Sequence, residues 1–285
     1  MNTPALRPFA RRRGAFAAAV ALFVYVGVFL TMNLADKLVL YPQTGRLDAP
    51  GAERRVVGEG RAAIEIWASR SRPQEEPAGY ALRFYGNADR AEHWITSEAR
   101  SYARQSIELW GVNYPGYGGS GGAATLAGVA RSAGQSFDAM ARVAGTKPVF
   151  VIGTSLGTTA ALHVAATRPV AGCVLQNPPA LRELIVGDHG WWNLWLLAFP
   201  ISRQIPRELD SIRNAASAKA PAIFISAESD EIVAAKYQRM VIDAYAGSKQ
   251  VILIPGARHN DPLPPAIDAQ FHAAFSEMFS RVAAR

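Results

Sequence analysis

The segment at residues 149–157 constrains the fold of this chain more than any other. It reads V-F-V-I-G-T-S-L-G, so an apolar, β-branched run leads directly into a Gly-x-Ser-x-Gly box. An alanine-rich stretch of helical character follows at residues 158–167. This order predicts a strand, a sharp turn and a helix, with Ser155 exposed above the carboxyl end of the strand. Gly153 and Gly157 fit such a turn, because side chains there would clash with closely packed backbone.

The chain is long enough for one large α/β domain or two small ones. It has 285 residues, of which 49% are hydrophobic and 19% are charged. Apolar runs alternate with helical patterns, which predicts βαβ units and a mostly parallel sheet flanked by helices. The candidate strands cover residues 78–85, 106–112, 148–152, 170–175, 222–226 and 250–254, and the candidate helices cover residues 89–104, 125–144, 156–167, 231–246 and 265–283.

The N-terminus predicts a membrane anchor. Residues 15–34 carry no charge, and a basic tail at residues 1–14 with four arginines precedes them. About twenty apolar residues match the thickness of a bilayer core. Because positive residues stay on the cytoplasmic side, we expect a single-pass helix with a cytoplasmic N-terminus and the main domain on the outer, periplasmic or extracytoplasmic side. A cleaved signal peptide is the alternative, but no small-x-small cleavage site follows the segment, and a buried core helix is the third.

Two further segments complete the domain plan. Residues 35–76 are interpreted as a connector with edge strands, and residues 77–285 as the catalytic domain, with the mostly parallel sheet and its flanking helices. Within that domain, residues 178–210 break the alternation of strands and helices and predict a small cap or lid. Three of the six tryptophans, Trp191, Trp192 and Trp195, lie within this insertion. We interpret them as an apolar substrate wall; the alternative is a helix pair packed on the sheet edge.

Charge and cysteine content exclude several classes of function. The formal net charge is +7, and the N-terminal arginines account for four of these charges. The basic balance therefore comes mainly from the tail, and we expect no nucleic-acid surface. Cys173 is the single cysteine, so no intrachain disulfide can form. The histidines lack metal-ligand spacing, and the glycine-rich residues 113–121 lack a phosphate-binding pattern, so no metal or cofactor is expected.

A serine nucleophile needs a base, and the base needs an orienting acid. After Ser155, an acidic loop follows the candidate strand at residues 222–226, and we assign the acid to Asp230, with Glu228 and Glu231 as local rivals. Glu231 is better placed to open the next helix, where an acid favours the helix dipole. His259 follows the last candidate strand and is the expected base. The other four histidines lie in helical patterns or in the insertion.

An oxyanion hole needs two backbone N–H donors. The first is expected from Leu156, directly after the nucleophile. The second is expected from Asn87, because Gly86 allows a tight turn after the strand at residues 78–85. The glycine-rich loop at residues 113–121 is interpreted as a buttress for this region.

With these motifs, the chain resembles the α/β-hydrolases, and in particular the single-pass, membrane-anchored α/β-hydrolase domain proteins. The matching motifs are Y-G-N-A at residues 85–88, N-Y-P-G-Y-G-G-S-G at 113–121, G-T-S-L-G at 153–157, S-D-E-I-V at 229–233 and G-A-R-H-N-D at 256–261, together with the Tyr41-Pro42 pair. The resemblance implies Ser155 as nucleophile, Asp230 as acid and His259 as base. Two departures touch the oxyanion region: Tyr85 stands where the family usually has histidine, and Asn113 and Pro115 replace residues of a D-Y-R-G-Y-G loop.

The sequence therefore predicts a membrane-anchored serine hydrolase that cleaves carboxylic esters or thioesters through an acyl-enzyme. Its expected partners are a small-molecule or lipid-like acyl substrate and, through the N-terminal helix, a membrane. A serine peptidase of the same fold and a non-catalytic scaffold are the alternatives. The pattern makes no prediction of oligomeric state.

Overall fold

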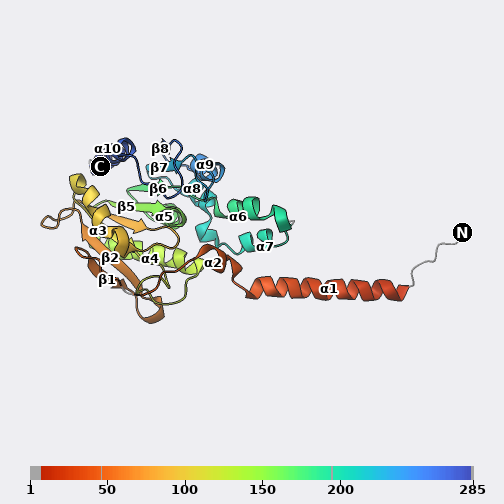
Figure 1. Ribbon diagram of the computed structural model, residues 1–285. Coiled ribbons are helices and arrows are strands. Elements are labelled where there is room, and N and C mark those ends of the chain that lie inside the picture. The colour runs from red at the N-terminus through yellow and green to blue at the C-terminus, as the bar shows by residue number, and fades with distance from the viewer. Residues whose placement is uncertain (1–7, 46, 194, 284–285) are drawn as a thin grey trace.

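Eight strands of five to seven residues, most of them apolar, build a central sheet with helices on both faces (Figure 1). The structure is a computed structural model that describes residues 8–45, 47–193 and 195–283. The strand order is β1-β2-β4-β3-β5-β6-β7-β8. The strands are β1 (Glu53–Val57), β2 (Ile64–Arg70), β3 (Gly79–Phe84), β4 (Ile107–Val112), β5 (Val149–Thr154), β6 (Gly172–Gln176), β7 (Ala222–Ala227) and β8 (Lys249–Ile254).

The pairing of the strands is mostly parallel, as predicted. Strands β3 to β8 pair in parallel, whereas β2 pairs antiparallel with both β1 and β4. The six candidate strands from residue 78 onward all form, within two residues of their predicted limits. Strands β1 and β2 come from the connector at residues 35–76, which thus extends the sheet of the main domain.

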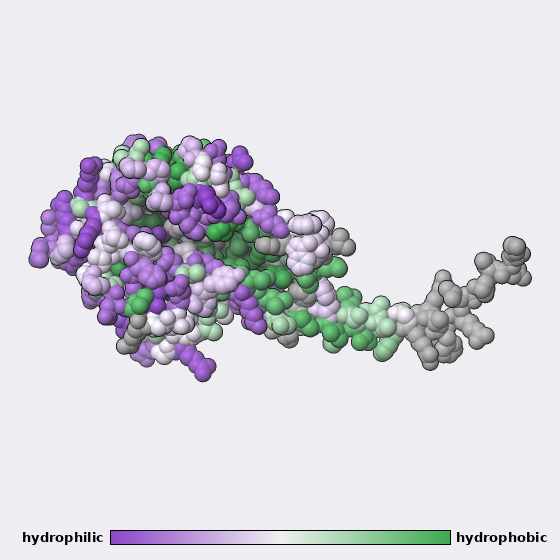
Figure 2. Space-filling model, viewed as in Figure 1, coloured by the Kyte–Doolittle hydropathy of each residue, from purple (hydrophilic) through white to green (hydrophobic). Residues whose placement is uncertain are grey.

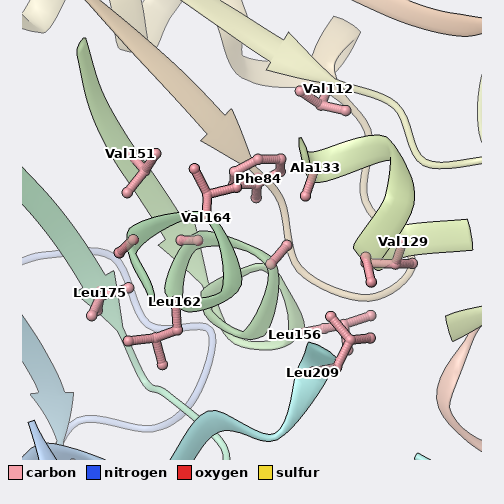
Figure 3. Packing of buried hydrophobic residues seen from close by; sticks show 14 of the residues in the cluster. Phe84, Val112, Val129, Ala133, Val151, Leu156, Leu162, Val164, Leu175 and Leu209 are labelled. Carbon is pink, nitrogen blue, oxygen red and sulfur yellow. The ribbon is translucent and has the colours of Figure 1, made fainter. Parts of the chain in front are cut away.

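Two helical layers cover the sheet. Helices α3 (Ala91–Ser101) and α10 (Pro265–Ala283) pack on one face, and α4 (Leu126–Ala144), α5 (Leu156–Thr167), α8 (Ser211–Ser217) and α9 (Ala235–Ala244) pack on the other. Side chains of β5 alternate between the layers, because successive residues of a strand point to opposite faces. Val151 lies in the cluster around α4 and α5 (Figure 3), and Phe150 lies in the cluster around α10.

Helix α5 approaches the sheet so closely that only glycine fits at the contact. A Cβ atom on Gly157 would collide with the backbone carbonyl of Phe84 at the end of β3. A Cβ atom on Gly153 would lie 2.6 Å from the carbonyl oxygen of Gly157. Both glycines of the Gly-x-Ser-x-Gly box are therefore required by packing, as the sequence predicts. The contact places the first turn of α5 beside the carboxyl end of β3.

The predicted insertion is a helical cap between β6 and β7. It consists of α6 (Leu181–His189), a 3-10 turn η3 (Trp191–Asn193), α7 (Ala198–Arg203) and a 3-10 turn η4 (Arg207–Leu209). Leu209 of η4 packs near Leu156 of α5, which ties the cap to the main core (Figure 3).

The N-terminal segment packs beside the cap. The short helix α2 (Leu34–Val39) carries the buried Ala35, whose N–H donates to Gln204 Oε1 over 3.1 Å. Before it, α1 (Pro8–Thr31) projects away from the domain on the side where the cap lies (Figure 1). The Tyr25 hydroxyl on α1 donates to the Leu196 carbonyl of the cap.

Within the part of the chain that the structure describes, no helix is both long and apolar enough to cross a membrane. The anchor at residues 15–34 therefore stays a prediction from the sequence. Residues 1–7 of the predicted basic tail lie outside the described residues, as do the side chains of residues 8–13.

Candidate active site

Ser155 occupies a strained turn between β5 and α5. Its φ of 51° lies in the left-handed region that non-glycine residues rarely adopt. The strain is held by the surroundings: its N–H donates to the Gln176 carbonyl over 2.8 Å, and its carbonyl accepts from the N–H and the hydroxyl of Thr158. The turn thus presents the Ser155 hydroxyl at the carboxyl end of the sheet, as predicted.

The structure brings Ser155, His259 and Asp230 into one hydrogen-bonded chain. Ser155 Oγ lies 3.0 Å from His259 Nε2, and His259 Nδ1 lies 2.7 Å from Asp230 Oδ2. Asp230 is acceptor-only when ionised, so Nδ1 carries the proton and Nε2 is left to accept one from Ser155. His259 and Asp230 are both buried, which shields this chain from bulk water. The arrangement is suited to activating a hydroxyl as a nucleophile.

The Asp230 carboxylate is held by four hydrogen bonds. Its Oδ1 accepts from the N–H groups of Ile232 and Val233, and its Oδ2 accepts from His259 and from Gln238 Nε2 over 3.0 Å. With every side of the carboxylate occupied, its direction toward the imidazole is set before any substrate binds. Gln238 lies fully buried on α9 and also donates to the Val233 carbonyl.

Asn177 holds the loop that carries His259. Its Nδ2 donates to the His259 carbonyl over 3.1 Å, and its Oδ1 accepts the Ala227 N–H over 2.9 Å. Its φ of 50° turns the chain out of β6. Sequence reasoning missed both Gln238 and Asn177. A buried glutamine has no sequence pattern of its own, and the only signal at residue 177 was an asparagine before two prolines, where a strand ends.

The two rival acids have other roles. Glu228 accepts a hydrogen bond from the Gly256 N–H over 3.2 Å, in the loop that follows β8. Glu231 was expected to open a helix, and this expectation is wrong, because α9 begins only at Ala235. Its carboxylate instead accepts the backbone N–H of His259 over 3.2 Å. Hydrogen bonds from the backbone N–H groups of Glu231 itself and of His259 hold the pKa of the Glu231 carboxyl below its usual value.

The expected oxyanion donors lie beside the nucleophile. Leu156 begins α5, where the first N–H groups have no acceptor within the helix. Gly86 lies so close to Ser155 that an added Cβ would be 3.6 Å from the serine Cβ. Asn87 follows it, and Asn87, Leu156 and Ser155 all line one cavity.

The side chain of Asn87 is clamped from two segments far apart in the sequence. Its Oδ1 accepts the Tyr41 N–H over 2.9 Å and the Tyr117 hydroxyl over 3.2 Å. Burial raises the pKa of Tyr117 to about 12, so its hydroxyl keeps the proton that it donates. Nearby, the Tyr114 hydroxyl donates to the Tyr85 carbonyl over 2.9 Å. The loop at residues 113–121 therefore supports the oxyanion region, as predicted.

A buried polar network holds that supporting loop in turn. Glu65 on β2 accepts from Asn113 Nδ2 and the Gly119 N–H, and Arg54 forms an ion pair with it. Burial acts to raise the pKa of Glu65, but the hydrogen bonds from Arg54, Gly119 and Asn113 outweigh it and lower the pKa. Asn113 also accepts the Ala91 N–H, which ties the loop to α3. An asparagine at residue 113 is thus compatible with a well-fixed loop.

The cavity above Ser155 has a volume of about 540 Å³ and an apolar wall. The cap, α2 and the loop after Asp230 supply this wall, and none of its described lining residues is charged. Of the three predicted wall tryptophans, the described lining includes Trp192 but neither Trp191 nor Trp195. The lining residues are Leu38, Val39, Tyr41, Asn87, Ser155, Leu156, Pro179, Leu181, Leu184, Ile185, Trp192, Leu197, Ala198, Ile201, Ile232 and Val233.

The remaining candidate groups lie elsewhere. His93 and His272 each contact an aspartate one turn away on the surface, and His163 is partly buried on α5. Burial raises the pKa of the Cys173 thiol to about 12, which removes it as a nucleophile. Among the residues described, no group of three or more histidine, cysteine or acidic side chains could hold a metal ion.

Comparisons with known sequences give distant relatives. No family model matches the chain. An uncharacterized protein of Mycobacterium tuberculosis is 31% identical over 153 residues, which is 53% of this chain and 52% of the relative, so the match spans about half of each protein. The alpha/beta hydrolase domain-containing protein aho-3 of Caenorhabditis elegans is 22% identical over 270 residues, or 86% of this chain and 76% of that protein.

Solved structures match over most of the chain. The esterase Est1E from Butyrivibrio proteoclasticus superposes with a TM-score of 0.65 at 12% identity, covering 80% of this chain and 99% of that one. An esterase of Pyrococcus furiosus gives 0.63 at 14% identity, covering 85% of this chain and 98% of that one. This likeness, with the sheet topology above, establishes that the chain has the α/β-hydrolase fold.

The contact between Gln238 and Asp230 predicts a positioning role for Gln238. Gln238→Met should lower kcat about tenfold with KM nearly unchanged, because Asp230 loses a charge-assisted hydrogen bond. Ser226→Ala is the matched control, since the Ser226 hydroxyl donates only to Gln238 Oε1. Steady-state kinetics and thermal unfolding of both variants test this. If both lose stability alike and Ser226→Ala loses as much kcat, Gln238 has only a structural role.

Proposed function

We propose that the protein is a serine hydrolase that cleaves carboxylic esters or thioesters of apolar acyl groups. The hydrogen-bonded chain from Ser155 through His259 to Asp230 carries this proposal, because it supplies a nucleophile, a base and an orienting acid in one line. The esterases among the structural neighbours support the same reaction class.

In the proposed reaction, His259 Nε2 takes the hydroxyl proton while Ser155 Oγ attacks the carbonyl carbon of the substrate. The N–H groups of Leu156 and Asn87 bind the oxyanion of the tetrahedral intermediate. The imidazolium then donates its proton to the leaving oxygen or sulfur, and the acyl group stays on Ser155. Water repeats the sequence with His259 as base and releases the carboxylic acid. Asp230 stabilises the imidazolium in both halves of the reaction.

The cavity supports an apolar acyl group as the substrate portion held by the protein. Its wall is hydrocarbon and aromatic, and it has no charged lining residue in the described chain to bind a peptide terminus or a charged side chain. A volume of about 540 Å³ falls in the range of sites for ligands of drug size, so it has room for an extended chain. These features favour esters over the serine peptidase alternative.

We also propose that residues 15–34 attach the catalytic domain to a membrane, with the N-terminus cytoplasmic and the domain outside. The uncharged segment behind a cluster of arginines supports this. Phe16, Leu22 and Phe23 of α1 are exposed, as suits a helix in contact with lipid.

Removing the nucleophile tests the reaction class. Ser155→Ala should lose both fluorophosphonate labelling and esterase activity, the latter by about 10⁴-fold or more, because no other group replaces the attacking oxygen. Ser101→Ala is a suitable control, since its hydroxyl donates to the Glu98 carbonyl on α3, away from the cavity. Labelling of the wild type that persists in Ser155→Ala would overturn the assignment, and a wild type that never labels would favour a scaffold.

The wall residue Trp192 tests the acyl preference. Trp192→Ala should lower kcat/KM about tenfold for long-chain p-nitrophenyl esters and leave the acetyl ester nearly unchanged, because only long chains reach the indole. Trp192 is 61% exposed, so the melting temperature should hardly move. Trp94→Ala, on α3 away from the cavity, is the control. Equal losses on all chain lengths would show that Trp192 is not an acyl contact.

Fusion and extraction experiments test the membrane attachment. The full-length protein should resist carbonate extraction, and an alkaline phosphatase fused to its C-terminus should be active, because that enzyme folds only outside the cytoplasm. An inactive fusion would place the domain in the cytoplasm. A mature protein that begins near residue 35 would favour the cleaved signal peptide.

A further inference from the structure

The cap exposes several large apolar side chains within nine consecutive residues. Each is about half exposed or more, and together they are called the cap patch here: Trp191, Trp192, Trp195, Leu196 and Phe199. Scattered apolar residues are normal on a protein surface, but a contiguous patch marks an interaction site.

The cap patch adjoins the mouth of the cavity above Ser155. Leu38, Tyr41, Trp192 and Ile232 line that cavity and are also exposed, which places them at its rim. Trp192 belongs to both the rim and the cap patch. The cap patch is therefore joined to the rim of the cavity through Trp192.

The cap patch is also continuous with α1. The Tyr25 hydroxyl on α1 donates to the Leu196 carbonyl, which brings the helix against the cap. Hydrophobic residues form a band from the domain onto α1 at this junction (Figure 2). Between residues 14 and 25, α1 carries no charge. Phe16 and Phe23 lie on nearly the same face of this helix, because they are seven residues apart, whereas Leu22 lies on another side, and all three are exposed. A helix without a polar face is stable when apolar material surrounds it.

The occupant that fits this surface is a lipid bilayer. Tryptophan is enriched at the boundary between lipid headgroups and acyl chains, where an amphipathic ring has both environments. Two cationic side chains lie near the apolar residues: Lys37 on α2 is exposed, and Arg203 Cζ lies 5.6 Å from the centroid of the Phe199 ring. Cationic side chains are typical of surfaces that face phospholipid headgroups. Because α1 projects from the cap side (Figure 1), a membrane that holds α1 lies against the cap patch.

We propose that the cap patch seats on a lipid bilayer and that the cavity takes its acyl substrate directly from the lipid phase. This rests on the proposed ester hydrolysis at Ser155 and narrows its substrate class to membrane-dissolved acyl esters. The apolar chain slides past Trp192 into the cavity while its ester group reaches Ser155, so the substrate never needs to dissolve in water.

The test uses two matched double variants of the full-length chain in phosphatidylcholine vesicles. Leu196→Gln with Phe199→Gln changes the cap patch but leaves its three tryptophans in place. Val143→Gln with Leu253→Gln changes two equally exposed apolar residues, on α4 and β8, away from the cap. The first readout is quenching of tryptophan emission by acyl-brominated phosphatidylcholine. The wild type and the control should be quenched, and the cap-patch variant should lose most of this quenching.

The second readout is activity on two substrates. On p-nitrophenyl palmitate dissolved in the vesicles, the cap-patch variant should lose about tenfold in kcat/KM, because the mouth of its cavity no longer contacts the lipid. On p-nitrophenyl acetate in water, all three proteins should agree within about twofold, since the catalytic groups are untouched. The control variant should match the wild type on both substrates.

The outcomes separate this proposal from the proposed function. Unchanged quenching in the cap-patch variant, or an equal loss on both esters, would overturn bilayer seating. Absence of quenching in the wild type, with a dimer that only the cap-patch variant loses, would assign the face to a second copy of the chain. A wild type that cleaves neither ester would overturn the hydrolase function, while the quenching would still decide where the cap patch lies.

Discussion

The close contact between α5 and β3 is the constraint on which the rest of the site depends. Because Gly157 has no Cβ, the helix can sit directly against the Phe84 carbonyl. This brings Leu156, at the start of α5, beside the loop that carries Asn87, and it leaves Ser155 in a left-handed turn between them. A serine on a relaxed turn would not face both expected N–H donors. The strain at Ser155 therefore accompanies the placement of the proposed nucleophile next to the two expected oxyanion donors.

The other half of the site depends on one buried carboxylate, Asp230, which accepts hydrogen bonds at both of its oxygens. Asp230 accepts four hydrogen bonds, from two backbone N–H groups, Gln238 and His259. A buried charge is costly unless it is paired and hydrogen-bonded, and here each bond also fixes direction. Asn177 holds the loop that carries His259, because its side-chain amide donates to the His259 carbonyl. The base is thus held by three elements, β6, β7 and α9, that meet only in the folded domain.

The N-terminal segment is part of the site as well as a connection to it. Leu38 and Tyr41 form part of the cavity wall, and the Tyr41 N–H bonds Asn87 in the oxyanion loop. The sheet is likewise extended by β1 and β2, and Glu65 on β2 holds the loop that supports Asn87. Helix α1 therefore ends a few residues before the cavity wall and before the residue that bonds one of the two expected oxyanion donors.

The sequence was enough to locate the six strands from residue 78 onward, the longer helices and the loops that carry the candidate site residues, because these follow from local patterns. Apolar runs, a glycine box and an acidic loop after a strand sufficed to select Ser155, Asp230 and His259, which the structure brings together. The error at Glu231 came from the same local rule: an acid before a helical pattern suggests a helix start, but the loop continues to Ala235 and uses the carboxylate to bond the His259 backbone. The partners of Asp230, the hydrogen bonds to Asn87 and the tryptophan that lines the cavity follow from the tertiary fold alone. These contacts join residues far apart in the chain, where the spacing of residue types carries no information about distance in space.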